Sequence, residues 1–276
     1  MTHVVCVGHA TRDTVLAVPR YPAPDALVLA TDVAVAGGGP AATAAVTLAR
    51  LGVETFFVGR VGDDDTGAFI RESLASEGVD VSELLTVPGG RSPESAIYVS
   101  SDTRAIAAYR GDLGPLRLSG RAEGLCRDAA WVHVDQTGYP AVPRDVRLSI
   151  DGGNPVDGLD LGGVALYSPT EAALARDIGT AEQALAAGAE LVVVTRGPRG
   201  CIAYTREETI EAPAAPLEDP VSTLGAGDVF HGALLAAFVR EEPPAEALAF
   251  ANRVAALSCR ALDGRSAIPT LQEVLV

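Results

Sequence analysis

The stretch STLGAGDVFHGALLAAF, residues 222–238, is the most informative part of the sequence. Its small residues at Gly225–Gly227 allow a tight turn that brings backbone N–H groups close to a ligand, and a helix is predicted over 226–240. The positive end of such a helix suits the charge that builds on a phosphoryl group during transfer. Asp228 falls in the first turn, where it can take a proton from an attacking hydroxyl. The spacing alone also fits a plain glycine turn with an acidic helix cap.

The basic residues narrow the ways in which a phosphate can be held. All 21 of them are arginine, against 36 acidic residues and a formal net charge of −15. Without lysine, the chain cannot form a Schiff base, anchor pyridoxal phosphate or build a Walker-type phosphate loop. Any phosphate must therefore be held by backbone N–H groups, arginines or a metal. The acidic balance argues against nucleic acid as a partner.

The cysteines and the hydropathy pattern bear on the compartment. The four cysteines are far apart and lie in or beside apolar stretches, which predicts buried thiols in a reducing cytosol and neither disulfides nor a zinc site. Residues 1–30 show no basic segment followed by an apolar run, and no apolar stretch approaches about 18 residues. We expect a cytoplasmic protein without a membrane segment.

From residue 130 onward, strands alternate with helices, which predicts a mostly parallel sheet covered on both faces. Only 12 residues separate the strands predicted at 130–134 and 147–151, so a helix between them must be short or absent. The strands of the sheet are predicted at 4–8, 130–134, 147–151, 163–167, 191–195 and 201–204, and the helices at 37–52, 171–176, 180–187, 226–240 and 244–261.

The antiparallel patterns of the first half predict a smaller sheet. Stretches 14–18 and 27–35 alternate in polarity, and 95–109 reads as a hairpin. We expect these pieces, within about 12–35 and 95–110, to form a β lid on a single α/β domain that spans residues 1–276.

GAGD at the start of a small-residue helix, late in a chain of this length, resembles the signature of the ribokinase-like (PfkB-type) carbohydrate kinases. Further segments resemble family elements in the same order, so the resemblance covers essentially the whole chain: 8–13, 37–40 (GGGP), 59–67 (GRVGDDDTG), 168–171 and 195–200 (TRGPRG). It implies a three-layer α/β/α fold with a mostly parallel central sheet and a small β-sheet lid. It also implies an ATP-dependent kinase, with MgATP at the carboxyl ends of the strands and a sugar beneath the lid.

The resemblance assigns roles residue by residue. Asp228 becomes the catalytic base, and the N–H groups of Gly225, Ala226, Gly227 and Asp228 become the anion hole. The sugar would contact Asp13, Gly37, Gly38, Gly39, Arg110 and Gln136. The nucleotide would contact Ser168, Thr195, Gly197, Gly200 and Asn252, with Glu171 near Mg²⁺. A homodimer through the lids is also implied.

Two positions depart from the family pattern. Ser222 replaces the first aspartate of the phrase DTxGAGD, which helps to hold a monovalent cation, so the resemblance does not extend to potassium activation. Ser168 replaces the asparagine of NxxE, which weakens one contact on the phosphate side.

The residues that make up the motifs indicate which class of sugar accepts the phosphoryl group. GGGPAATAA, GRVGDDDTG and GAGDVFHGAL resemble the sulfofructose kinase branch, and Ala42 stands where ribokinases carry asparagine. We therefore expect a ketose-like sugar of the fructose or sulfofructose type, with Arg110 and Gln136 meeting any acidic group. A sugar acid such as 2-keto-3-deoxygluconate, or a nucleoside, is the alternative acceptor.

Some of the same residues are also compatible with two other classes of protein. Gly37-x-Gly39-x-x-Ala42 matches the dinucleotide fingerprint GxGxxG/A, which leaves an NAD-dependent oxidoreductase open. A non-catalytic sugar-binding protein is a third class. The histidines show no metal-ligand spacing: His9 could reach the sugar, and packing or solvent contact is favoured for His231 over contact with the site.

Overall fold

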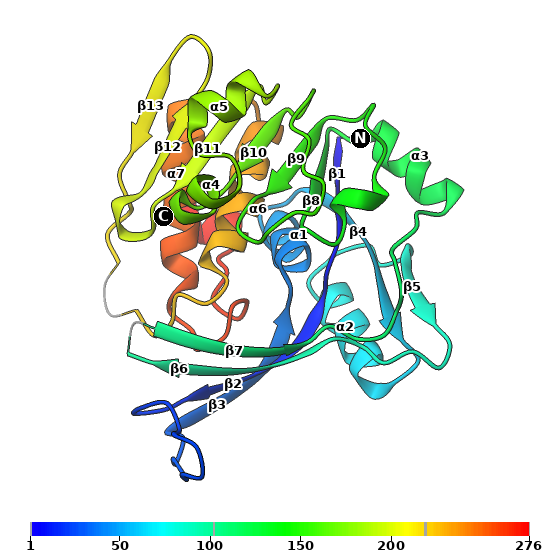
Figure 1. The fold of residues 1–276 in the computed structure, drawn as a ribbon, viewed down its shortest axis with the longest axis vertical. Coiled ribbons are helices and arrows are strands. Elements are labelled where there is room, and N and C mark those ends of the chain that lie inside the picture. The colour runs from blue at the N-terminus through cyan, green and yellow to red at the C-terminus, as the bar shows by residue number, and fades with distance from the viewer. Residues whose placement is uncertain (1, 102, 218–219, 276) are drawn as a thin grey trace.

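A nine-stranded sheet forms the middle of the molecule in the computed structural model, which describes residues 2–101, 103–217 and 220–275 (Figure 1). Its strands pair in parallel from β5 to β11, and the two pairs at the other edge, β11 with β12 and β12 with β13, are antiparallel. The order across the sheet is β13 (Thr209–Ala212), β12 (Cys201–Tyr204), β11 (Leu191–Thr195), β10 (Leu166–Ser168), β9 (Leu148–Asp151), β8 (Trp131–Val134), β1 (His3–Val7), β4 (Glu54–Gly62) and β5 (Leu84–Val87).

Helices cover both faces of this sheet. The side chains of β1 alternate between two apolar cores: Val4 and Cys6 enter one, and Val5 and Val7 enter the other. The first core packs against α1 (Pro40–Arg50), α2 (Asp65–Ala75), α6 (Ala226–Val239), α7 (Pro244–Ser258) and α8 (Leu271–Leu275), and the second against α3 (Gly120–Asp128), α4 (Glu171–Asp177) and α5 (Ala181–Ala186). This is the three-layer α/β/α arrangement expected from the sequence.

A second sheet of four strands, called here the lid sheet, lies across one end of the large sheet (Figure 1). Its order is β3 (Asp32–Gly38), β2 (Thr11–Ala17), β6 (Glu94–Ser100) and β7 (Thr103–Tyr109). Val15, Ile97 and Val99 on its inner face pack against Leu262, which ties it to the body of the protein. The predicted hairpin at 95–109 is confirmed as β6 and β7.

Several boundaries differ from the sequence-based expectation. The strand predicted over 27–35 begins only at Asp32, and Gly37 and Gly38 end that strand instead of starting the next helix. The strand predicted over 163–167 is displaced to β10, because Gly162 and Gly163 form a turn. The connection between β8 and β9 contains only a 3₁₀ turn, Tyr139–Ala141, as the short spacing predicted. A second 3₁₀ turn spans Gly197–Arg199.

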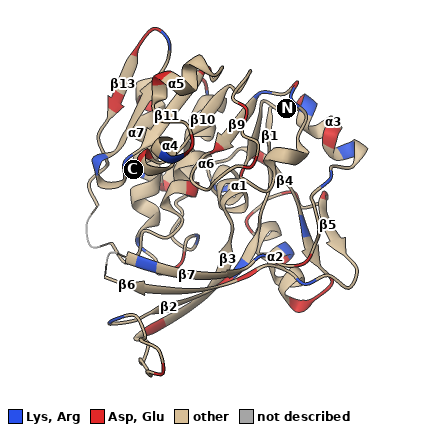
Figure 2. Cartoon of the chain, viewed as in Figure 1, with Lys and Arg blue, Asp and Glu red and all other residues tan. Residues whose placement is uncertain are grey.

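Charged residues lie mainly on the helices and loops, whereas the strands in the middle of the large sheet are mostly uncharged (Figure 2). All four cysteines are buried and free, as predicted. Among the helices that the structure describes, none has the length and apolar character needed to span a bilayer.

Candidate active site

The N-terminus of α6 forms the centre of the site. Gly225 caps the helix with φ 75°, a left-handed conformation, and a Cβ there would lie 3.0 Å from Gly264. The N–H of Val229 donates to the carbonyl of Gly225 over 2.9 Å, while the N–H of Ala226 turns back to Thr223 over 3.3 Å. A helix leaves its first N–H groups without intrahelical acceptors. The turn therefore presents N–H groups, including that of Gly227, at the positive end of the helix dipole.

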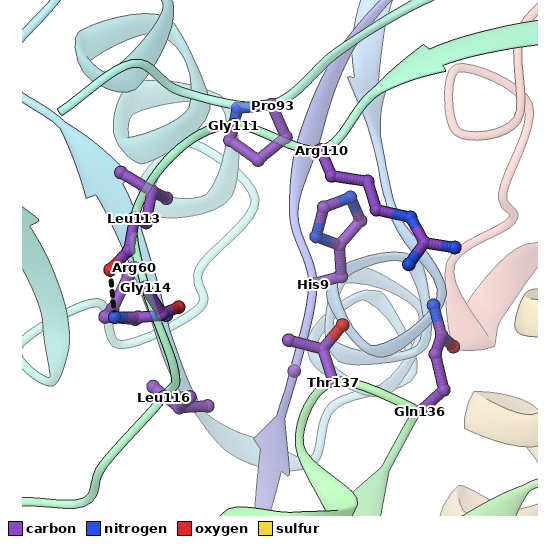
Figure 3. Close-up of a pocket in the computed structure, with 11 residues that line it drawn as sticks. His9, Arg60, Pro93, Arg110, Gly111, Leu113, Gly114, Leu116, Gln136 and Thr137 are labelled. Atoms are coloured by element: carbon purple, nitrogen blue, oxygen red, sulfur yellow. Dashed lines mark hydrogen bonds between the residues drawn. The ribbon is translucent and has the colours of Figure 1, made fainter. Parts of the chain in front are cut away.

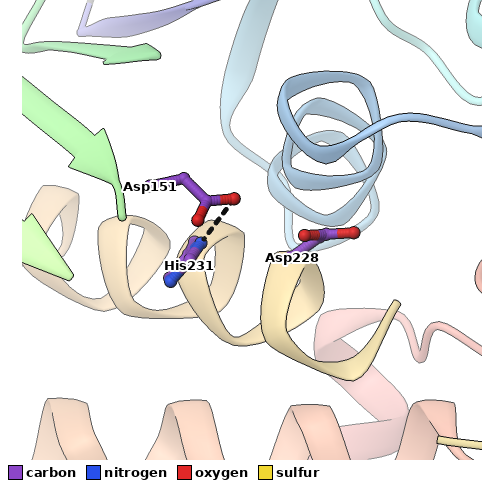
Figure 4. Close-up of side chains that lie close together, drawn as sticks. All are labelled: Asp151, Asp228 and His231. Carbon is purple, nitrogen blue, oxygen red and sulfur yellow. Dashed lines mark ion pairs between the residues drawn. The ribbon is translucent and has the colours of Figure 1, made fainter. Parts of the chain in front are cut away.

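Asp228 lies in the first turn of α6 (Figure 4). Burial raises its pKa to about 7, and the negative charge of Asp151 adds to the rise, while the positive charges of His231 and Arg104 oppose it. A base works best when its pKa is near the operating pH. The carboxyl group of Asp228 therefore has the basicity needed to accept a proton from a hydroxyl near neutral pH.

His231 is not a packing or solvent residue, which corrects the interpretation favoured by the sequence. It is 6% exposed, and its Nδ1 lies 3.4 Å from an Oδ2 of Asp151. These two side chains and Asp228 place one ligand atom each within 4.8 Å of one another. Burial acts to raise the pKa of Asp151, but the charge of His231 and the hydrogen bonds to the carboxylate together lower it. Burial acts to lower the pKa of His231, but the charge of Asp151 helps to raise it. The two carboxylates and the imidazole therefore form a cluster of titratable groups at the N-terminal end of α6.

Asp13 lies on the lid sheet, and only 9% of it is exposed. Its Oδ1 accepts a hydrogen bond of 2.7 Å from Thr11, and a Cβ at Gly38 would overlap its carboxylate. The absence of a side chain at Gly38 therefore allows the Asp13 carboxylate to lie against the backbone there. This places a buried carboxylate, suited to pairs of sugar hydroxyls, where the lid sheet joins α1.

Arg265 is buried behind these glycines. Its guanidinium donates to the carbonyl of Gly38 over 2.6 Å and to Oγ1 of Thr43 over 3.1 Å. Burial lowers its pKa to about 10, although the negative charges of Asp13 and Asp228 act in the opposite direction. Arg265 therefore lies near both carboxylates and fixes the glycine segment between them.

Asp135, at the end of β8, holds three segments together. Its carboxylate accepts hydrogen bonds from the backbone N–H groups of His9 (2.7 Å), Ala41 (3.3 Å), Thr137 (2.8 Å) and Gly138 (3.0 Å). A Cβ at Gly8 would overlap this carboxylate. Asp135 therefore organises the backbone from which His9 and Gln136 project.

Arg110 and Gln136 lie together in a pocket of about 260 Å³ (Figure 3). Their side chains point toward each other beside His9. Burial lowers the pKa of His9, and the charge of Arg110 acts in the same direction, so the imidazole is neutral at pH 7. Arg60 lines the other side, where its guanidinium donates to the carbonyls of Leu113 and Gly114.

The residues expected to meet a nucleotide lie at the carboxyl ends of β10 and β11 and on α7. Thr195 ends β11 and leads into the turn that Gly200 closes with φ 78°. The amide of Asn252 donates to Pro213 over 2.9 Å and so fastens α7 to the end of β13. Ser168 is fully buried, and its hydroxyl donates to the carbonyl of Val193 over 3.1 Å. Ser168 therefore has an internal partner, so its hydroxyl is not offered to a ligand.

Glu171 opens α4 on the same edge and forms an ion pair with Arg199, which follows Gly197 in the turn (2.5 Å). Both side chains are more than half exposed, so the pair is weak and can be exchanged for other partners. An exposed carboxylate suits Mg²⁺, which prefers oxygen ligands and keeps several waters.

The model of the pfkB family of carbohydrate kinases matches residues 1–149 and 168–271. The chain belongs to this family. It is 27% identical to the ribokinase of Bacillus subtilis over 99% of this chain and 98% of that protein. It is 30% identical to the ATP-dependent ribose-1-phosphate kinase of Halopiger xanaduensis over 99% of this chain and 97% of that protein.

Solved structures agree with this assignment. The structure of Arabidopsis thaliana ribokinase complexed with ribose and ATP has a TM-score of 0.83 and 26% identity, covering 100% of this chain and 98% of that one. The chain is therefore a phosphotransferase that acts on a sugar hydroxyl, and ATP is the substrate that kinases of this family share.

Family membership removes the two competing classes. Gly37 and Gly38 end a strand of the lid sheet, whereas a dinucleotide fingerprint must follow a strand of the central parallel sheet. The match to GxGxxG/A is therefore incidental, and an NAD-dependent oxidoreductase is excluded. A sugar-binding protein without catalysis is excluded by the kinase family itself.

Sequence reasoning did not identify Asp135, Asp151 or Arg265. Asp135 directly follows β8 and Asp151 is the last residue of β9. Parallel sheets place ligand-binding residues at the carboxyl ends of their strands, so strand ends were a usable signal. Arg265 carries no local signal. It follows the last long helix, and only the tertiary fold brings it behind Gly38.

Proposed function

We propose that the chain uses MgATP to phosphorylate a ketose-like sugar that carries an acidic group, with Asp228 as general base. The observation that supports the reaction most strongly is the position of Asp228, with its pKa near 7, in the first turn of a helix that points its N–H groups outward. We propose further that the lid sheet covers the sugar and belongs, with the rest of residues 1–276, to one domain.

In this mechanism Asp13 binds sugar hydroxyls and Asp228 accepts the proton of the reacting one. The sugar oxygen forms a bond to the γ-phosphorus while the bond from that phosphorus to the bridging oxygen of ADP breaks. The N–H groups of 225–228 stabilise the negative charge on the transferred phosphoryl group. Mg²⁺, when bound, neutralises phosphate charge, and Glu171 is the carboxylate that would face it, directly or through water.

Three arrangements support an acidic group on the acceptor. Arg110 projects into the pocket near His9, and Gln136 adds an amide donor opposite it (Figure 3). In the part of the chain that the structure describes, no carboxylate forms an ion pair with Arg110. A guanidinium beside an amide is suited to carboxylate, sulfonate or phosphate. The likeness to a ribose-1-phosphate kinase adds a sugar phosphate to this class of acceptors.

A panel of acceptors assayed for ADP release tests this proposal. We expect 6-deoxy-6-sulfofructose, 2-keto-3-deoxygluconate or ribose 1-phosphate to exceed fructose, ribose and adenosine by at least about tenfold in kcat/KM. The variant Arg110→Ala should lose that preference and keep its activity on neutral sugars, while Arg117→Ala, which changes an arginine outside the pocket, serves as a control. A neutral sugar preferred by the unmodified protein would reject the acidic acceptor. No ADP above background with any acceptor would reject the kinase assignment.

We also propose a homodimer formed through the lid sheets. Apolar side chains gather on β3 and the loop before it: Leu27, Leu29 and Val33 are 83%, 77% and 59% exposed. Contiguous exposed apolar surface usually marks an interaction site. Sedimentation should show a dimer for the unmodified chain and a monomer for Val33→Glu/Val35→Glu, and a monomer in both would reject the proposal.

A further inference from the structure

We propose that His231, paired with Asp151, acts as a positioning residue: it offsets the negative charge of Asp151 and so keeps the neighbouring Asp228 carboxylate ionised while the acceptor sugar is bound. The inference rests on Asp228 as the base of the proposed function. It concerns two side chains that the phosphoryl transfer itself does not use. They come from the end of β9 and from the second turn of α6, and they meet beside the base (Figure 4).

The pair is enclosed. Asp151 is 4% exposed and His231 is 6% exposed, so neither charge is balanced by bulk water. Oδ1 of Asp151 accepts the N–H of Gly153 over 2.8 Å, and its Oδ2 faces Nδ1 of His231 at 3.4 Å. Breaking a buried ion pair by removing one partner leaves an uncompensated charge that acts strongly on its neighbours.

The charges around the two groups come from several elements. Asp228 is faced by Asp151 (β9), Asp135 (after β8), His231 (α6), Arg104 (β7) and Arg265 (after α7). His231 is faced by Asp151, Asp228 and His133, whose ring centroid is 5.7 Å away. Burial lowers the pKa of His133 to about 3, so this ring is neutral, and its Nδ1 is 3.1 Å from the hydroxyl of Ser149. The charge opposite Asp151 therefore comes from His231.

Removing that charge would leave two carboxylates close together, the buried Asp151 and the half-buried Asp228. Two such groups cannot both ionise easily, so one of them holds a proton. Asp151 keeps the N–H of Gly153 as a donor, which favours its ionised form, and the proton therefore settles on Asp228. A protonated Asp228 cannot accept the proton of the sugar hydroxyl.

The test compares pH profiles of kcat/KM for the unmodified chain, His231→Asn and the double variant His231→Asn/Asp151→Asn. In His231→Asn we expect the acidic limb to move up by about one to three pH units, so that activity at pH 6 falls at least about tenfold more than at pH 9. The double variant removes both charges, and its limb should return toward that of the unmodified chain. A merely structural role would lower activity equally at all pH values.

Three results would overturn the inference. One is a His231→Asn profile whose limb coincides with that of the unmodified chain. Another is a double variant displaced as far as the single one. The third is inhibition by added ZnCl₂ that His231→Asn abolishes, because it would identify a metal site. Melting temperature and ADP affinity, measured on each variant, establish that it is folded. Activity retained in Asp228→Asn would instead reject the base itself, so the two failures are distinguishable.

Discussion

Asp228→Asn is expected to lower turnover by about 10²–10⁴-fold, the usual contribution of a general base. The amide has nearly the same shape but cannot accept the proton of the attacking hydroxyl. The N–H groups at the start of α6 remain in place, so the affinity for ADP should be little changed. Calorimetric titration with ADP and an ADP-release assay on the best acceptor measure the two quantities separately.

The same substitution should stabilise the fold at neutral and alkaline pH. The unfolded chain ionises this carboxyl near its ordinary pKa of 3.8, whereas the folded chain retains the proton up to about pH 7. The folded state therefore binds more protons, and stability falls as the pH rises between these values, by up to about 1.4 kcal/mol for each unit of difference. The gain in Tm for Asp228→Asn should be largest above pH 7 and should disappear near pH 4.

Glu246→Gln is a matched control, because Glu246 also lies in the first turn of a helix, α7, but is exposed. It should alter neither turnover nor the pH dependence of Tm. Unchanged turnover in Asp228→Asn would show that another group is the base. A lower Tm at pH 8 would show that the carboxylate is compensated in the folded state and is not raised in pKa.

Local sequence predicted the elements that depend on strong apolar patterns. β1, β11 and α6 lie close to their predicted bounds, because β1 and β11 consist mainly of apolar residues and α6 is buried without a break from Val229 to Ala237. By contrast, α3 was missed, since Gly120 and Gly124 interrupt it and only Ala122 and Cys126 are buried. Strand β5 has four residues and is stabilised by pairing with β4, which no local pattern reports.

The residues of the site also fall into two groups: those that the local sequence identifies and those that only the folded structure brings together. Asp228 and Asp13 lie in sequence motifs, so the resemblance to a known family could identify them. The ion pair of Asp151 and His231 joins residues that are 80 positions apart, one at a strand end and one in a helix. The local sequence of neither segment indicates that the two side chains are in contact. Their charges, and hence the pKa of Asp228, are properties of the packed site and could not be predicted from the chain.

Gly38→Ala is expected to lower kcat/KM for the sugar by about 10²-fold, because displacing a substrate-binding group by about 1 Å has effects of this size. A methyl group at this position would overlap the Asp13 carboxylate and would lie 2.6 Å from the hydroxyl of Thr11. The carboxylate is the end of a side chain, so it can turn away without moving the backbone. The damage should therefore fall on sugar binding, with ADP affinity retained and KM for the sugar raised.

Gly124→Ala provides the control, since Gly124 lies within α3 and a Cβ there meets nothing within 4 Å. It should leave the kinetics unchanged. Because Gly38→Ala acts through Asp13, the double variant Gly38→Ala/Asp13→Asn should be no worse than Asp13→Asn alone. Additive losses would show that Gly38 serves the site independently of Asp13. A simultaneous fall in Tm and in ADP affinity would show that Gly38 is needed for the fold and does not act through the sugar site.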